Sequence, residues 1–111
     1  MRRDELYLHD IIEAADAIDR FLLNVAEDEF LADELRQSAV LQKLMIMGES
    51  AAHLSPELKA QYDEIEWRDI IAFRNLAIHA YFAVDWKIVW YTANHDAPLL
   101  RKQIIKVLKA L

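Results

Sequence analysis

The residues best suited to chemistry in this chain lie together between Arg74 and Tyr81. This stretch holds an arginine, an asparagine, a histidine and a tyrosine (Arg74, Asn75, His79 and Tyr81) among apolar neighbours. The guanidinium group of arginine offers a rigid fork of donors that matches the oxygens of a phosphate group. The imidazole of histidine can accept or give up a proton near neutral pH. Together these residue types form a minimal set for cleaving a phosphodiester bond, and the sequence offers no comparable second cluster.

Each polar residue of the stretch has a role that suits its chemistry. Arg74 would bind the phosphate and stabilise the charge that develops on it in the transition state. His79 would take a proton from the attacking hydroxyl group or give one to the leaving oxygen. RNA carries its own nucleophile, the 2′-hydroxyl group, so the pair requires no metal ion or other cofactor. Asn75 could orient the arginine or the phosphate, and the phenol of Tyr81 could donate a hydrogen bond or be modified.

The spacing of Arg74 and His79 limits how the two side chains can meet. Five residues along a continuous α-helix turn two side chains about 140° apart and raise one about 7.5 Å above the other. One uninterrupted helix therefore keeps them from sharing a ligand. Either the helix ends between them, or a second copy related by a two-fold axis completes the site. The sequence leaves both arrangements open.

A purely structural role is also compatible with these residues. Arg74 could pair with Glu49 or Asp69, and His79 could cap the end of a helix. Glu49 stands in an apolar setting, so its expected role is to pair with a buried arginine, and a catalytic role is less favoured. It follows Gly48, the only glycine of the chain. Glycine inside a helix costs about 1 kcal/mol relative to alanine, and a close approach of another backbone would explain it.

The sequence segments that must position this stretch have apolar residues mainly at helical spacing. Apolar residues recur at helical spacing over residues 4–26, which predicts a first helix. The acidic run Glu27-Asp28-Glu29 predicts the start of a second helix that continues to about residue 54. Ser55 and Pro56 form a helix-start signature, which predicts a short helix to about residue 62.

The remaining helices flank the polar stretch on both sides. Trp67 opens a helix that leads into Arg74, and Asp85 is expected to cap a final helix. Pro98 lies inside that final helix and should kink or split it. The sequence therefore predicts an all-α, up-and-down bundle of four main helices plus a short helix, forming a single domain over residues 1–111.

An acidic stripe accompanies the apolar face of the first helix. Its members, which step by three residues, are Asp10, Glu13, Asp16 and Asp19. The favoured interpretation is a solvated helix face. A metal site or a contact with a basic partner is the less favoured alternative. No metal ligand set is assigned, because the histidines outside the polar stretch have no metal-ligand spacing between them.

Composition narrows the class of protein further. The net charge of −6 argues against broad binding of nucleic acid, so DNA is not an expected partner. The absence of cysteine excludes a disulfide framework and a thiolate zinc site. No apolar run reaches the length of a membrane span and no signal-peptide pattern is present, so a soluble cytoplasmic protein is expected. Hydrophobic residues make up 55% of the chain, and the second helix is apolar nearly all round, which favours packing against a second copy.

Several motifs in the right order resemble those of the HepT-like branch of the HEPN superfamily, once catalogued as the domain of unknown function DUF86. The resemblance covers most of the chain. The matching segments besides the Arg-x4-His stretch are Gln37–Val40, Met47–Ala51, Leu54–Glu57, Trp67–Ile70, Val84–Asp85 and Val89–Trp90. The chain departs slightly where Ser50 replaces the alanine that is common after Gly-Glu in the family.

The resemblance implies a fold, an activity and a partner. It implies a compact helical bundle that forms a homodimer and brings two Arg-x4-His motifs together at the interface. Members resemble metal-independent ribonuclease toxins of type II toxin–antitoxin modules. Arg74 and His79 fall on the catalytic positions, and Asn75 falls on the polar position that follows the arginine. Tyr81 falls on the tyrosine that the antitoxin, a minimal nucleotidyltransferase (MNT), modifies with AMP, and this added charge and bulk would block RNA.

An alternative from a different functional class remains open at this point. The chain could be a non-catalytic helical subunit of the nucleotidyltransferase, with the polar stretch as a docking segment and Tyr81 as a substrate of the partner. The acidic net charge favours this alternative somewhat. A degenerate toxin kept as a structural subunit is a weaker possibility, because the motif is intact. The sequence does not name the RNA target, which could be tRNA or mRNA.

Overall fold

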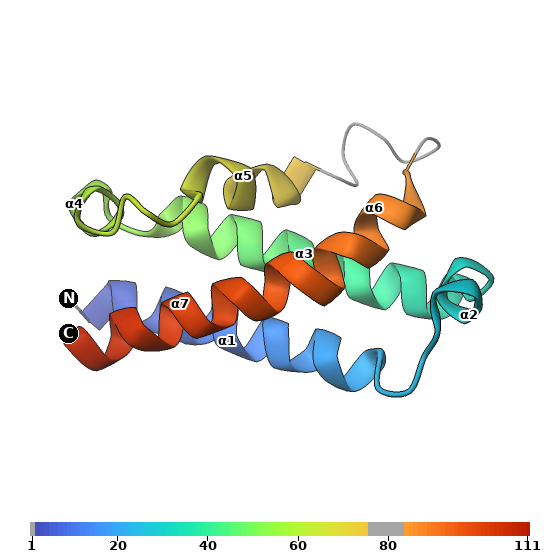
Figure 1. Ribbon diagram of the computed structural model, residues 1–111. Coiled ribbons are helices and arrows are strands. Elements are labelled where there is room, and N and C mark those ends of the chain that lie inside the picture. The colour runs from blue at the N-terminus through green and yellow to red at the C-terminus, as the bar shows by residue number, and fades with distance from the viewer. Residues whose placement is uncertain (1, 76–83) are drawn as a thin grey trace.

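The computed structural model of the protein describes residues 2–75 and 84–111, and every regular element within these two ranges is helical. The helices run in the order α1 (Arg2–Phe21), α2 (Glu27–Leu31), α3 (Glu34–His53), α4 (Pro56–Gln61), α5 (Trp67–Ala72), the 3-10 turn η1 (Phe73–Asn75), α6 (Trp86–Tyr91), the π-helical turn η2 (Thr92–Asp96) and α7 (Ala97–Ala110). Helices α1, α3, α5 and the run from α6 to α7 alternate in direction, and α1 begins at the same end of the molecule where α7 finishes (Figure 1). The predicted all-α, up-and-down bundle is confirmed. Among the helices of these ranges, none is long and apolar enough to cross a membrane.

Helix α3 lies at the centre of the bundle. It packs against α1, against α2 near its own start, and against α5 and η1, while α7 packs on α1 (Figure 1). The most deeply buried side chains come from α1, α2, α3, α6 and α7, and are Leu8, Ile11, Ile18, Phe30, Val40, Leu44, Met47, Val89, Ile104 and Val107. Burying one such side chain contributes about 1.5–3 kcal/mol. Much of the apolar surface of α3 is thus buried on several sides within one chain, although Leu35 remains 81% exposed.

The first helix ends earlier than the periodicity predicts. Residues 4–26 were expected to be helical, but α1 stops at Phe21 and a turn follows. Asn24 adopts a positive φ of 60°, a left-handed conformation that asparagine tolerates better than most residues. The backbone N–H of Val25 then donates to the carbonyl oxygen of Leu22 over 3.0 Å. The apolar residues Leu22 and Val25 continue the helical spacing, so the pattern conceals the turn.

The second predicted helix is broken into two, which corrects the expectation of one helix from Glu27 to residue 54. Helix α2 ends at Leu31, and Asp33 caps a new helix by accepting a hydrogen bond of 3.1 Å from the backbone N–H of Arg36. The backbone N–H and then the side chain of Arg36 hold the pKa of Asp33 below its ordinary value. The buried amide of Gln37 donates to the carbonyl oxygens of Phe30 and Leu31, each over 3.1 Å. The Phe30 carbonyl oxygen also accepts from the backbone N–H of Asp33 over 3.1 Å, so the Gln37 amide adds to the hydrogen bonds that join α3 to the end of α2.

The predicted start of the short helix α4 is confirmed. The hydroxyl oxygen of Ser55 accepts from the backbone N–H of Leu58 over 3.2 Å, and Pro56 occupies the first turn. The same hydroxyl group donates to the buried carboxylate of Asp4 over 2.7 Å, and the backbone N–H of Ser55 donates to it over 2.9 Å. This carboxylate ties the beginning of α1 to the beginning of α4.

The C-terminal run from Trp86 to Ala110 is helical throughout. Asp85 caps it as predicted, because its carboxylate accepts from the backbone N–H groups of Lys87 and Ile88 over 3.0 and 3.4 Å. Pro98 was expected to kink or split this helix. Instead the helix widens into the π-helical turn η2 just before the proline, which falls in the first turn of α7. A wide turn of this kind is one way in which a helix accommodates a residue without an N–H group.

Candidate active site

Arg74 and Asn75 lie in η1, the turn that ends the α5 helix. The start of α5 is fixed by Trp67, whose indole N–H donates to the carbonyl oxygen of Tyr62 over 3.0 Å, and Ile70 anchors the helix in the core. The α-helix ends at Ala72, and the tighter 3-10 turn from Phe73 to Asn75 follows. Asn75 is exposed. The other two residues of the predicted site, His79 and Tyr81, lie outside the described residues.

Gly48 of α3 lets the backbone of this turn approach α3 closely. A Cβ atom at Gly48 would lie 2.7 Å from the backbone nitrogen of Arg74 and 2.8 Å from the carbonyl oxygen of Ile70. Real Cβ atoms essentially never come this close to other heavy atoms, and both neighbours are backbone atoms that no side-chain rotation can move away. The expectation that a close backbone approach explains the only glycine is confirmed. The position of Arg74 therefore depends on the absence of a side chain at residue 48.

Glu49, the next residue of α3, lies beside the guanidinium group of Arg74. Its Oε2 atom is 3.8 Å from the Nη1 atom of Arg74, so the predicted pairing with Glu49 is found. The expectation of a buried arginine is wrong, because the side chains of Arg74 and Glu49 are 42% and 56% exposed. An ion pair this exposed adds little to the free energy of unfolding. The guanidinium group therefore keeps a solvent-facing side at which a phosphate could bind.

His53 is a further polar side chain on this part of α3, and sequence reasoning did not assign it to the site. Its Nδ1 atom lies 2.8 Å from the carbonyl oxygen of Glu49 and 3.5 Å from Oε1 of the Glu49 carboxylate. A carbonyl oxygen can only accept, so Nδ1 carries the hydrogen of this bond. Tyr7 of α1 stacks on the imidazole, with ring centroids 5.2 Å apart. The i,i+4 spacing of Glu49 and His53 is the signal that could have indicated their contact.

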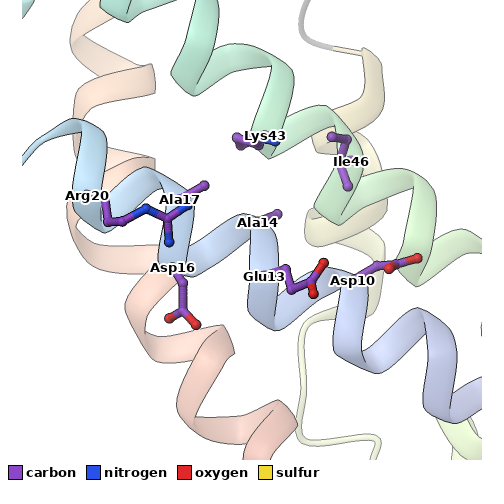
Figure 2. A pocket seen from close by; sticks show the side chains of 8 residues that line it. All are labelled: Asp10, Glu13, Ala14, Asp16, Ala17, Arg20, Lys43 and Ile46. Carbon is purple, nitrogen blue, oxygen red and sulfur yellow. The ribbon is translucent and has the colours of Figure 1, made fainter.

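The acidic stripe of α1 lies on another face of α3. Asp10 and Glu13 line an open hollow between α1 and α3, together with Lys43 of α3 (Figure 2). Lys43 and Gly48 are five residues apart, which places them about 140° apart around the helix. Asp16 binds Nε of Arg101 over 2.6 Å, within the same chain. No group of three or more acidic or histidine side chains in the described ranges could hold a metal ion. Asp10, Glu13 and Asp19 are exposed, which matches the favoured interpretation of a solvated face, whereas Asp16 is partly buried.

The protein is all-α, and its turn η1 presents Arg74, a half-exposed arginine that begins the Arg-x4-His motif. These two features together define its class. The sequence profile of the ribonuclease HepT-like family matches residues 11–107, and the chain belongs to this family. The expectation of a HepT-like, ribonuclease-type protein is confirmed at the level of the family.

Individual relatives agree with this assignment. The chain is 37% identical over 103 residues to a probable ribonuclease HepT of Thermococcus cleftensis, covering 93% of this chain and 94% of the relative. It is 27% identical over 109 residues to a putative RNase of Caldanaerobacter subterraneus, covering 98% and 97% of the two chains. A protein of Methanocaldococcus jannaschii named gamma-glutamylcyclotransferase and putative RNase is 31% identical over 112 residues, and the chain spans only 50% of its length. No solved structure matches the chain significantly.

Proposed function

We propose that this protein is an endoribonuclease that cleaves RNA without a metal ion and acts as the toxin of a type II toxin–antitoxin module. Arg74 binds the scissile phosphate and stabilises its developing charge, and His79 transfers the proton. The 2′-hydroxyl group of the RNA is the nucleophile. Asn75 orients the arginine or the phosphate from the adjacent position of η1. The enzyme is a homodimer, and the two motifs meet at the dimer interface.

The observation that carries the proposal is the setting of Arg74. The turn η1 packs closely against Gly48, which fixes the backbone of Arg74, while the Arg74 side chain remains 42% exposed beside Glu49. A purely structural arginine would be expected to lose its exposure and to have close, well-aligned partners. The family membership and the names of the relatives, which include a probable ribonuclease HepT, support the same activity.

Cleavage of RNA by the purified protein in the presence of EDTA tests the proposed activity. The substitutions Arg74→Ala and His79→Ala should each lower the cleavage rate by about 100-fold or more, because each removes a group that acts in the transition state. Arg68→Ala is the matched control, since Arg68 is an exposed arginine of the same helical segment. It should cleave like the wild type. Unchanged cleavage in both site variants, with the fold intact by circular dichroism, would refute the proposal.

The proposed control of the toxin acts at Tyr81. A minimal nucleotidyltransferase antitoxin adenylylates this tyrosine, and the added phosphate charge and bulk keep RNA away from Arg74. Incubation with such a partner and ATP should increase the mass of the wild type by one AMP group and abolish cleavage. Tyr81→Phe should remain unmodified and active. Modification of Tyr81→Phe to the same extent would show that Tyr81 is not the target.

The acidic net charge of −6 keeps a second candidate function in view, that of a non-catalytic subunit of the nucleotidyltransferase. It predicts that Arg74→Ala and His79→Ala weaken binding of the partner or its modification of Tyr81, while the wild type never cuts RNA. Growth arrest that depends on His79, in cells that express the protein without its partner, would contradict this candidate.

A further inference from the structure

Two neighbouring residues of α3 contact two different parts of Arg74. Gly48 meets the backbone of η1, and Glu49 meets the guanidinium group. The backbone contact is tight, since a Cβ atom at residue 48 would lie 2.7 Å from the nitrogen of Arg74. The side-chain contact is loose, with 3.8 Å between Nη1 and Oε2. The two contacts therefore act differently. The contact with Gly48 fixes the backbone of Arg74, and the contact with Glu49 favours one orientation of its guanidinium group.

We infer that Gly48 and Glu49 form a positioning unit for Arg74, in which Gly48 sets the place of its backbone and Glu49 orients its guanidinium group until a phosphate of RNA replaces that contact. The inference rests on the proposed function and deepens it by assigning two positioning residues to the same site. Neither residue is assigned a contact with the reacting atoms.

The carboxylate of Glu49 also lies near a second polar side chain, that of His53. Its Oε1 atom lies 3.5 Å from Nδ1 of His53, and its Oε2 atom lies 3.8 Å from Arg74. His53 cannot swing away freely, because its Nδ1 bonds the Glu49 carbonyl oxygen over 2.8 Å and its ring stacks on Tyr7. The Glu49 carboxylate therefore lies between Arg74 and a histidine whose ring is positioned by α1 as well as α3.

The weakness of the Arg74–Glu49 contact is what suits it to this role. Both side chains are about half exposed, so water screens their attraction and a bidentate phosphate can compete for the guanidinium group. Without the negative charge of Glu49 the guanidinium group is free to bind phosphate but samples more orientations. The loss should therefore appear in kcat, which depends on alignment in the transition state, and not as an increase in KM.

The test compares Glu49→Gln, which keeps the size of the side chain and removes its charge, with the control Glu13→Gln at an exposed glutamate of α1. In 1H–15N NMR spectra of the full chain, the Arg74 Nε–Hε signal is assigned by its loss in Arg74→Lys. Glu49→Gln should move this signal and Glu13→Gln should not. On an RNA substrate, Glu49→Gln should lower kcat about 10-fold with KM equal to or below that of the wild type, while Glu13→Gln matches the wild type.

The two readouts separate this inference from the proposed function. An Arg74 signal that is identical in Glu49→Gln and wild type overturns the inference, whether or not RNA is cleaved. A moved signal with kcat equal to that of Glu13→Gln also overturns it, because the contact then has no part in catalysis. If Glu49→Gln moves the Arg74 signal but the wild-type protein never cleaves RNA, the ribonuclease proposal is refuted while the Arg74–Glu49 contact stands.

Discussion

Arg74 combines a fixed backbone with a side chain that stays accessible. Its backbone nitrogen lies against Gly48, while its side chain is 42% exposed. An arginine that served only to stabilise the fold would gain more from burial with close partners than from a contact of 3.8 Å. The combination suits a group that must be preorganised and still open to a ligand.

At the scale of a single residue, the prediction concerns the planar guanidinium group of Arg74, whose N–H groups can bind two phosphate oxygens at once. Arg74→Lys keeps the positive charge but replaces a planar, bidentate group with a point charge. We expect this variant to lose about 10- to 100-fold in kcat/KM for RNA while its thermal midpoint stays near that of the wild type. Steady-state cleavage rates and thermal denaturation of both proteins check this. A lysine variant with full activity would show that charge alone is sufficient.

Residue types predicted part of the candidate site, and tertiary contacts add the surroundings of Arg74. The sequence pointed to Arg74 and to its pairing with Glu49, and it predicted a close backbone approach at Gly48. It did not reveal that the pair is half exposed, because burial depends on how α5 meets α3. It also left His53 unassigned, since the contact with Tyr7 joins helices that are distant in sequence.

At the scale of elements, the close packing of η1 on α3 depends on the glycine at position 48. Gly48→Ala should improve the helix propensity of α3 by about 1 kcal/mol, but the new methyl group would displace backbone atoms of α5 and η1 at a larger cost. We expect a net loss of about 1–2 kcal/mol in the free energy of unfolding. Urea denaturation measures it, with Gln42→Ala on an exposed position of α3 as the control. A more stable Gly48→Ala protein would contradict the packing described above.

The cap of α3 predicts a dependence of stability on pH. Hydrogen bonds from the backbone N–H and the side chain of Arg36 lower the pKa of Asp33 from its ordinary value of 3.8. A carboxylate with a lowered pKa in the folded state stabilises the protein above the pKa of the unfolded state, and this contribution is lost as pH falls through the folded value.

Asp33→Asn removes this titration and keeps a side-chain oxygen for the cap. The wild type should be the more stable protein at pH 6, and the difference in free energy of unfolding should shrink as the pH falls below 3.8. Denaturation curves at several pH values measure the difference. A difference that is constant with pH would show that the ionised carboxylate contributes nothing at this cap. The effect should be small, because the Asp33 side chain is partly exposed and water screens its interaction with Arg36.

Some helix starts were predicted correctly from the sequence, but the start of α3 after Asp33 and the ends of α1 and α2 were missed. Ser55 and Asp85 act as caps where the sequence placed them, because a cap depends on a side chain and its immediate neighbours. The ends at Phe21 and Leu31 were missed because Leu22, Val25 and Leu35 continue the apolar spacing across both turns. The bond from Gln37 that supports the second break spans two helices and has no local sequence signal.

For the whole molecule, several large apolar side chains stand in solvent. Leu35 of α3 is 81% exposed, Tyr91 of α6 is 58% exposed and Leu99 of α7 is 57% exposed. Such residues, in a chain that is 55% hydrophobic, support the proposal that a second copy covers part of this surface. A dimer also offers one of the two arrangements that let Arg74 and His79 act together despite their spacing on a helix.

Mixing two inactive variants distinguishes the two arrangements. In a mixed dimer of Arg74→Ala and His79→Ala, a site that takes its arginine from one subunit and its histidine from the other is left intact once. Unfolding and refolding the two variants together should then restore about a quarter of the wild-type activity, since half of the dimers are mixed and each has one intact site. No recovery, with mixed dimers demonstrated by mass spectrometry, would exclude a site built from one arginine and one histidine of different subunits.

The central claim is that Arg74 and His79 cleave RNA through its own 2′-hydroxyl group. The chemical groups at the ends of the cleavage fragments test this claim most directly. The wild-type protein is incubated in EDTA with an RNA oligonucleotide and with its 2′-O-methyl counterpart, and the fragments are weighed by mass spectrometry. We predict fragments that end in a 2′,3′-cyclic phosphate and begin with a 5′-hydroxyl group, and no cleavage of the methylated strand. Cleavage of the methylated strand, or fragments that appear only when a divalent metal is added, would contradict the account.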